Sequence, residues 1–243
     1  MKLALATVIA LAPLLFHPAH AGGSNYGIAP GTNTNITGKV SEWPVPTPKF
    51  ARDPAIAPDG SIFITVMSGN KIARFDTKTH TFQEWDMPAG HRPHGLLVDK
   101  QGMVWTTGNG NGTIGKLDPA SGATVEYKTP SGRGGPHTLV ITDDQSTIWF
   151  TMQSGDKVAS IDTKTGTIKV YAMPGGPYAV NTDGAGIVWV NEINTDTVVR
   201  FDPKSEQMRV VKLPSTGVGI RKMVVDAQGK LRYQGNCIKT PYE

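Results

Sequence analysis

The sequence predicts an all-β protein, a β-propeller of about five four-stranded blades whose last blade is incomplete. The first observation is a repeated phrase, "RPHGLLVDKQGMVWTTG", then "GPHTLVITDDQSTIWFT", then "GPYAVNTDGAGIVWVNE". The second is a set of landmarks that recur every 40 to 44 residues: a proline, an aromatic residue after a turn, and an aspartate 13 residues after that aromatic residue. The apolar runs between them are short and show no helical periodicity. Such a unit is typical of a propeller blade.

Each unit contains four expected strands in a fixed order. The first strand follows the proline–histidine phrase, and a turn leads to the second strand, which holds the aromatic residue. The third strand ends at the repeated aspartate, which we interpret as a turn former. The fourth ends at the landmark proline. The aromatic residues are Phe63, Trp105, Trp149 and Trp189, and the aspartates are Asp76, Asp118, Asp162 and Asp202.

The two ends of the repeat differ from its middle. Residues 37–46 resemble a fourth strand with no blade before it, so we expect this N-terminal strand to complete the last blade and close the ring. The last unit has Arg232 in the aromatic position and Pro241 in its third strand. Because proline has no N–H donor for a strand ladder, the last blade is expected to be three-stranded or a shortened copy.

The N-terminus predicts export. Residues 1–21 read as a signal peptide, with an apolar run at 3–16 and small residues before a cleavage site after Ala21. We expect an irregular linker at 22–36, a propeller domain at 37–243, and a periplasmic or secreted protein. No other stretch of the mature chain is long and apolar enough for a membrane span. We expect the mature chain to be monomeric.

Composition excludes several classes of function. The single cysteine, Cys237, allows no internal disulfide and no thiolate metal site. The formal charge is +4 and the basic residues are scattered, so nucleic-acid binding has little support.

A ring of polar residues is expected at the start of each first strand, where blade packing alone calls for apolar side chains. Since the first strand of a blade lines the propeller channel, these residues should meet at the channel mouth. They suit an anionic or carbonyl-rich small molecule, with histidine as a base and tyrosine or arginine as an electrophile. The alternative is that they only solvate the axis. The five positions are Arg52, His94, His137, Tyr178 and Arg221.

Other polar residues complete this expectation. The second strands run back to the same face and end at Asn109, Gln153 and Glu192. His80 and His91 fall outside the register and are expected at the surface.

These phrases, with "GIRKMVVDAQGKL" near the C-terminus, resemble the virginiamycin B lyase (streptogramin lyase) family. The resemblance implies a seven-bladed propeller and linearisation of a cyclic depsipeptide by elimination. It also implies Mg²⁺ that polarises the ester carbonyl and a histidine that removes the neighbouring proton. By this resemblance His137 is the base, and His94 and Tyr178 bind the substrate. The register of the ring adds Arg52 and Arg221 to the substrate-binding residues.

The sequence departs from the family at the metal ligands. The family has glutamates two residues before the catalytic histidine and four residues after the blade's tryptophan. Here these positions are Gly135 and Gln153 around His137, and Arg92 and Asn109 around His94. The nearby candidates that remain for a metal are Glu192, Gln153 and Asp53.

Three functions therefore stay open. The first is an exported lyase-like propeller, dependent on Mg²⁺ if it acts as the family does. The second is a non-catalytic propeller that binds a ligand or partner. The third is a lactonase-type hydrolase, which would need a calcium site for which Asp53, Asn109 and Glu192 are the candidates.

Overall fold

The computed structural model describes residues 41–130, 135–226 and 228–235. The chain divides into two units, Met1–Glu42 and Trp43–Glu243, and the fold belongs to the second. The strands form four four-stranded antiparallel sheets and one two-stranded sheet, as the repeat predicted for a β-propeller with an incomplete last blade. One short 3-10 helix, η1 (Gln153–Gly155), interrupts them.

The strands follow the predicted order within every blade. Blade one contains β1 (Ala51–Ile56), β2 (Ile62–Val66), β3 (Lys71–Phe75) and β4 (Phe82–Asp86). Blade two contains β5 (Pro93–Val98), β6 (Val104–Gly108), β7 (Thr113–Leu117) and β8 (Thr124–Lys128). Blade three contains β9 (Pro136–Ile141), β10 (Thr147–Met152), β11 (Lys157–Asp162) and β12 (Ile168–Ala172). Blade four contains β13 (Pro177–Thr182), β14 (Val188–Glu192), β15 (Thr197–Asp202) and β16 (Gln207–Lys212). The last sheet contains β17 (Ile220–Val225) and β18 (Leu231–Gly235).

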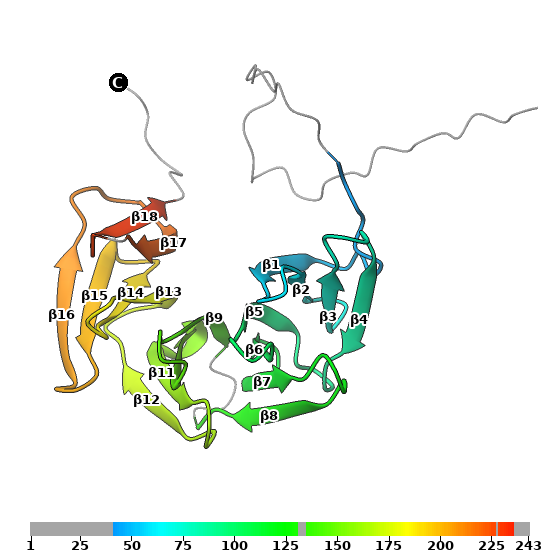
Figure 1. Cartoon of the computed structure of the whole chain (residues 1–243). Helices are drawn as coiled ribbons and strands as arrows, with labels where there is room; N and C mark the ends of the chain where they lie inside the picture. The colour runs from blue at the N-terminus through cyan, green and yellow to red at the C-terminus, as the bar shows by residue number, and fades with distance from the viewer. Residues whose placement is uncertain (1–40, 131–134, 227, 236–243) are drawn as a thin grey trace, which may run out of the picture. The chain divides into compact units, whose positions relative to one another are not determined.

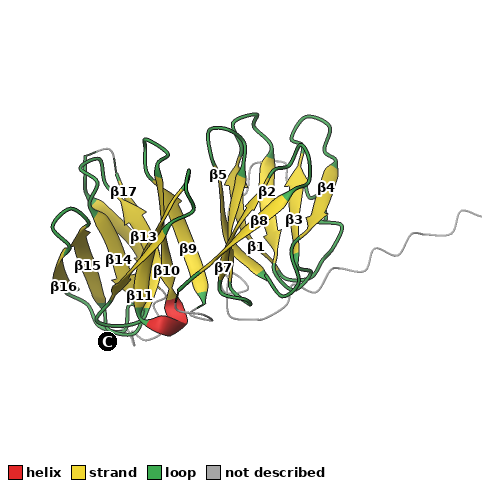
Figure 2. Ribbon diagram, turned by 90° about the horizontal axis from the view of Figure 1, so that it is seen from below, coloured by secondary structure: helices red, strands yellow, loops and turns green. Residues whose placement is uncertain are grey.

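The first strands of successive blades lie next to one another in chain order, on the inner side of the sheets (Figure 1). Figure 2 shows the sheets along their edges, with turns at both ends of the strands and η1 at one end. Apolar side chains fill the spaces between sheets. Trp105 of blade two, for example, is fully buried with Ile148 and Phe150 of blade three. Packing between neighbouring blades therefore fixes the positions of the inner strands.

A β-bulge interrupts the inner strand of each blade, and it falls at the predicted ring residues. In blade two, His94 and Gly95 together face Thr107 on β6. The Thr107 hydroxyl accepts a hydrogen bond from the Gly95 N–H at 2.8 Å and donates one to the His137 carbonyl of the next blade, also at 2.8 Å. Because a bulge redirects the side chain that it carries, it turns the ring residues away from the sheet face.

The same bridge recurs in the other complete blades. The second-strand side chain accepts from the bulge of its own blade and donates to a carbonyl on the inner strand of the next one. The donor and acceptor pairs are Thr65 to His94, Thr151 to Tyr178, and Asn191 to Ile220, at 2.8, 2.9 and 2.7 Å.

Arg232 occupies the aromatic position of the last blade and keeps one function of the tryptophan. In blades two and four the indole N–H donates to an aspartate in the first turn, Trp105 to Asp99 and Trp189 to Asp183. Arg232 Nε donates in the same way to Asp226 at 2.9 Å. The repeated aspartates after the third strands are turn formers, as predicted; Asp76, for example, accepts from the Lys78 and Thr79 N–H groups.

The prediction that residues 37–46 form a closing strand is wrong for the part that the structure describes. Residues 41–46 form no strand. Trp43 packs instead on the first blade, with its ring centroid 5.3 Å from that of Phe75 and 4.6 Å from that of His80. Pro44 and Pro46 lack the N–H groups that a strand ladder needs.

Several expectations concern residues outside the described ranges. These are the signal peptide at 1–21, the linker at 22–36, residues 37–40, Cys237, and a third strand of the last blade at Pro241. Within the described ranges, no helix has the length and apolar character to cross a membrane.

We expect the last sheet to be the least stable part of the propeller. β17 and β18 leave Val224 and Tyr233 exposed to 52% and 41%, whereas β6 is buried throughout. Amide hydrogen exchange should therefore be faster in β17, β18 and residues 41–46 than in β6. Equal protection of β17 and β6 would contradict this prediction.

Candidate functional site

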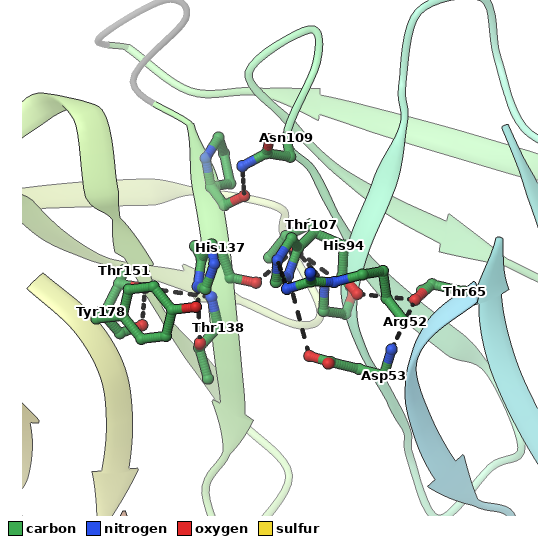
Figure 3. Close-up of polar contacts among 12 residues, drawn as sticks. Arg52, Asp53, Thr65, His94, Thr107, Asn109, His137, Thr138, Thr151 and Tyr178 are labelled. Atoms are coloured by element: carbon green, nitrogen blue, oxygen red, sulfur yellow. Dashed lines mark hydrogen bonds and ion pairs between the residues drawn. The ribbon is translucent and has the colours of Figure 1, made fainter. Parts of the chain in front are cut away.

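The five ring residues form one continuous row of side chains along the inner strands. Arg52 Nη2 lies 2.6 Å from His94 Nε2, and the ring centroids of His94 and His137 are 3.8 Å apart. The centroids of His137 and Tyr178 are 4.2 Å apart, and Arg221 Nη1 donates to the Tyr178 hydroxyl at 2.8 Å. Figure 3 shows His94 and His137 between Arg52 and Tyr178. The structure thus brings together all five residues that the repeat placed in register.

The row is more buried than a channel mouth. His94 and His137 are each 5% exposed and Tyr178 is 7% exposed, whereas Arg52 and Arg221 are partly exposed. The inner strands lie close enough for the aromatic rings to stack on one another. The alternative that the ring residues only solvate the axis therefore does not fit these three residues, whose common location was predicted.

Both imidazoles are held neutral at physiological pH. Burial, aided by the nearby charges of Arg52 and Lys222, lowers the pKa of His94 to about 4. Burial is also the main cause that lowers the pKa of His137 to about 3. The charges of His94 and Arg52 lower this pKa further, and the Asp53 carboxylate opposes them. A neutral imidazole has one acceptor nitrogen and one donor nitrogen.

The hydrogen bonds indicate which nitrogen of His94 is protonated. A guanidinium can only donate, so His94 Nε2 must accept from Arg52 and carry its proton on Nδ1. Nδ1 is buried without a hydrogen-bond partner in the described ranges, 3.9 Å from an Asp53 carboxylate oxygen. His137 Nδ1 lies 3.1 Å from the Thr138 hydroxyl, which leaves Nε2 as its second polar position.

Lys222 is a member of the site that the sequence did not reveal. It follows Arg221 in the bulge of β17, as Asp53 follows Arg52 in the bulge of β1. Lys222 Nζ and the Asp53 carboxylate are 3.8 Å apart, so this ion pair joins the first and last inner strands. The sequence signal that could have revealed Lys222 is its position directly after a ring residue. A bulge brings both of its residues toward the axis, so the residue after each ring residue also belongs to the site.

Two histidines outside the register have different surroundings. His80 is exposed, as expected. The expectation that His91 lies at the surface is wrong, because it is fully buried. Its Nδ1 lies 2.8 Å from a Glu126 carboxylate oxygen and its Nε2 lies 2.8 Å from the Thr106 hydroxyl. These partners satisfy both ring nitrogens, so His91 is a structural residue of blade two.

The polar residues at the ends of the second strands do not gather around the ring. Asn109 Nδ2 donates to the Pro136 carbonyl at 3.2 Å. Gln153 is the first residue of η1, and its N–H donates to the Gly135 carbonyl at 3.2 Å. Glu192 is buried, and its carboxylate accepts from the Gly175 N–H and from the hydroxyls of two threonines, Thr195 and Thr197. The sequence predicted their shared end of the sheets but not these local partners.

The residues at the family's metal-ligand positions do not fit a magnesium site. Magnesium prefers carboxylate oxygens, and the described ranges contain no group of three or more His, Cys, Asp or Glu side chains able to hold an ion. Gly135 has a φ of 61°, and a Cβ there would lie 3.0 Å from Ser154 Oγ. A glutamate at 135 would therefore require a strained backbone.

Comparison with known sequences agrees with the repeat. The sequence model described as the virginiamycin B lyase family matches residues 31–176. A virginiamycin B lyase from Nocardia farcinica (strain IFM 10152) is 31% identical over 117 residues, which cover 48% of this chain and 40% of that protein. The matched region thus covers less than half the length of this curated relative.

Solved structures show the same fold. Virginiamycin B lyase from Staphylococcus aureus is 26% identical, with a TM-score of 0.75 over 83% of this chain and 69% of that chain. A streptogramin B lyase is 22% identical, with a TM-score of 0.74 over 80% of this chain and 65% of that chain. A third structure is a catalytically inactive form of the S. aureus enzyme with quinupristin, at 23% identity and a TM-score of 0.75. On its repeat, its propeller fold and the match over residues 31–176, this chain belongs to the virginiamycin B lyase family.

Proposed function

We propose that this protein opens a cyclic ester by carbon–oxygen elimination at the row of His94, His137, Tyr178 and their flanking arginines. The observation that carries the proposal is the direct contact of a neutral imidazole, His137, with a phenol that is hydrogen-bonded to a guanidinium. Elimination beside a carbonyl needs a positioned base and a group that stabilises negative charge on oxygen. Family membership favours this reaction over other chemistry on the same fold.

His137 Nε2 is the base that we assign. It takes a proton from the carbon next to the one that bears the ester oxygen. The C–H electron pair forms a carbon–carbon double bond, the C–O bond breaks, and the ester becomes a carboxylate. The linear product has the same atoms as the cyclic substrate.

Tyr178 and Arg221 are the electrophilic pair. Arg221 donates to the phenol oxygen at 2.8 Å, which leaves the phenol proton available for a substrate oxygen that gains charge. Arg52 orients His94 through the 2.6 Å contact with Nε2, and we assign both residues to substrate binding. Because the imidazoles are almost fully buried, the partly exposed Arg52 or Arg221 has to move aside when substrate enters.

No step of this proposal passes through a metal. Mg²⁺ would polarise the substrate carbonyl, but Gly135, Gln153, Arg92 and Asn109 supply no carboxylate for it. A calcium-dependent lactonase has no better support, since the Glu192 carboxylate is occupied by its own loop and Asn109 by the Pro136 carbonyl.

A ligand-binding propeller without catalysis is the second candidate. The observation that favours it is the low pKa of His137, about 3, because a base this weak accepts a proton poorly at neutral pH. Arg52 and Arg221, partly exposed at the two ends of the row, would then bind an anionic small molecule.

Incubation with quinupristin, with and without EDTA, tests the proposal. Elimination changes the retention time and the fragmentation spectrum of the substrate but not its mass. Turnover that persists in EDTA supports the metal-free mechanism, and turnover that EDTA abolishes contradicts it. If quinupristin and simpler cyclic esters stay intact while quinupristin raises the melting temperature, the binding candidate replaces the lyase.

We also propose that the protein is exported, with cleavage after Ala21. The apolar run at 3–16 and the small residues before the cleavage position support this proposal. The mass of the mature protein from its native host tests it.

A further inference from the structure

A cavity lies away from the histidine row, between blades one and two. Each inner strand begins at the histidine row and ends at the first turn of its blade, so the first and third turns lie at the opposite end of the strands. The cavity opens among these turns, between Asp59 of blade one and Gly102 and Pro119 of blade two. Its volume is about 440 Å³, within the usual range for small-molecule sites.

This blade interface differs from its neighbours in the repeated aromatic position. Trp105 and Trp189 each donate an indole N–H to the aspartate of the first turn. Blade one has the smaller Phe63, which has no donor. The guanidinium of Arg74 binds Asp59 instead, at 2.8 Å. The cavity therefore occurs at the one complete blade whose aromatic position is not tryptophan.

The walls combine aromatic surface with a net positive charge. Phe63 and Trp85 lie stacked, with centroids 6.0 Å apart and an interplanar angle of 23°. Arg74 neutralises Asp59 in an ion pair, so Lys100 is the lining residue whose charge no lining carboxylate balances. Its ammonium donates to the backbone carbonyl of Asp143, in the first turn of blade three, at 3.0 Å.

From these walls we propose that the cavity is a binding site for a small planar aromatic carboxylate. The ring packs against the partly exposed Trp85, which stacks on the buried Phe63. The carboxylate pairs with the Lys100 ammonium, which exchanges its bond to the Asp143 carbonyl for the ligand. The site is independent of the histidine row and of the proposed lyase activity.

Titration with 2-naphthoate, and with the neutral 2-naphthamide for comparison, tests the proposal by ¹H–¹⁵N NMR. A dissociation constant of about 1 mM is expected for a ligand of this size. The resonances that shift should be the Gly60, Gln101 and Gly102 amides and the Trp85 indole. Absence of shifts at 10 mM ligand, taken as about ten times that dissociation constant, overturns the proposal, as do shifts confined to other blades.

Two variants, each with a matched control, identify the site. Ala120→Trp places a ring in the cavity and should weaken naphthoate binding at least tenfold, whereas Lys164→Trp, at the same turn position of blade three, should not. Lys100→Gln should weaken naphthoate about threefold and leave naphthamide unchanged, whereas Lys128→Gln should change neither. Unchanged affinity in both Ala120→Trp and Lys100→Gln would show that the cavity is not the site.

Discussion

Acidification from pH 7 to pH 4 is expected to lower the free energy of unfolding by several kcal/mol. The unfolded chain protonates its histidines near pH 6.5, whereas the folded state holds the pKa of His94 at about 4 and that of His137 at about 3. Between these values the unfolded state binds more protons, so stability falls as the pH falls. Each residue contributes about 3 kcal/mol at pH 4, because one pKa unit corresponds to about 1.4 kcal/mol.

The charges around the pair support this sign. Burial is the main cause at both imidazoles. At His94 the charges of Arg52 and Lys222 also oppose protonation, and at His137 the Asp53 carboxylate reduces the effect of burial without reversing it. Burial of His91 lowers its pKa too and acts in the same direction. Carboxylates such as Asp59 and Asp144, whose pKa values hydrogen bonds lower to about 2, lose their stabilising effect only at more acidic pH.

Urea denaturation at pH 7, 5.5 and 4 measures the effect. His137→Phe keeps an aromatic ring in the row but cannot titrate, so its loss of stability between pH 7 and pH 4 should be smaller than that of the wild type by about 3 kcal/mol. His80→Gln, at an exposed position, should follow the wild type. An equal pH slope in His137→Phe and wild type would show that the imidazole is accessible to protons in the folded state.

Replacement of His137 by alanine is expected to lower turnover by about 10²–10⁴-fold, the usual contribution of a general base. The cause is the loss of the only nitrogen that we assign to proton removal. His94→Ala should chiefly raise KM, because His94 binds substrate and does not take the proton. Tyr178→Phe should lower kcat, since the ring stays in place while the donor is lost. Single-turnover chromatography of the linear product measures all three.

The pH profile tests whether the base has the low pKa of His137, and the alanine variant distinguishes a catalytic His137 from a structural one. Because its pKa is about 3, kcat/KM should stay almost constant between pH 7 and pH 5. With a histidine of the ordinary pKa, about 6.5, as the base, kcat/KM would fall roughly 25-fold over the same range. If His137→Ala retains turnover while its melting temperature is unchanged, the base assignment is wrong and the row is a binding or packing feature.

The sequence by itself determined the blades and the register of the ring. The strands obey spacing rules within one unit of about 42 residues, which depend on local β-structure and turn chemistry. Because every unit repeats the same geometry, counting back 11 residues from Trp105, and 12 from Trp149 where the turn is one residue longer, had to place His94 and His137 at equivalent points of neighbouring inner strands. The family resemblance rested on the same phrases, and the match over residues 31–176 confirmed it.

Only the tertiary structure decided how these side chains meet. The 3.8 Å stacking of His94 and His137, their burial and their low pKa values depend on the distance between strands of different blades, which no spacing within a unit encodes. The Asp53–Lys222 pair joins residues 169 positions apart, since bulges at both positions turn them toward one axis. The burial of His91 and the cavity beside Phe63 arise in the same way, because side-chain environment is set by neighbours that lie far away in the chain.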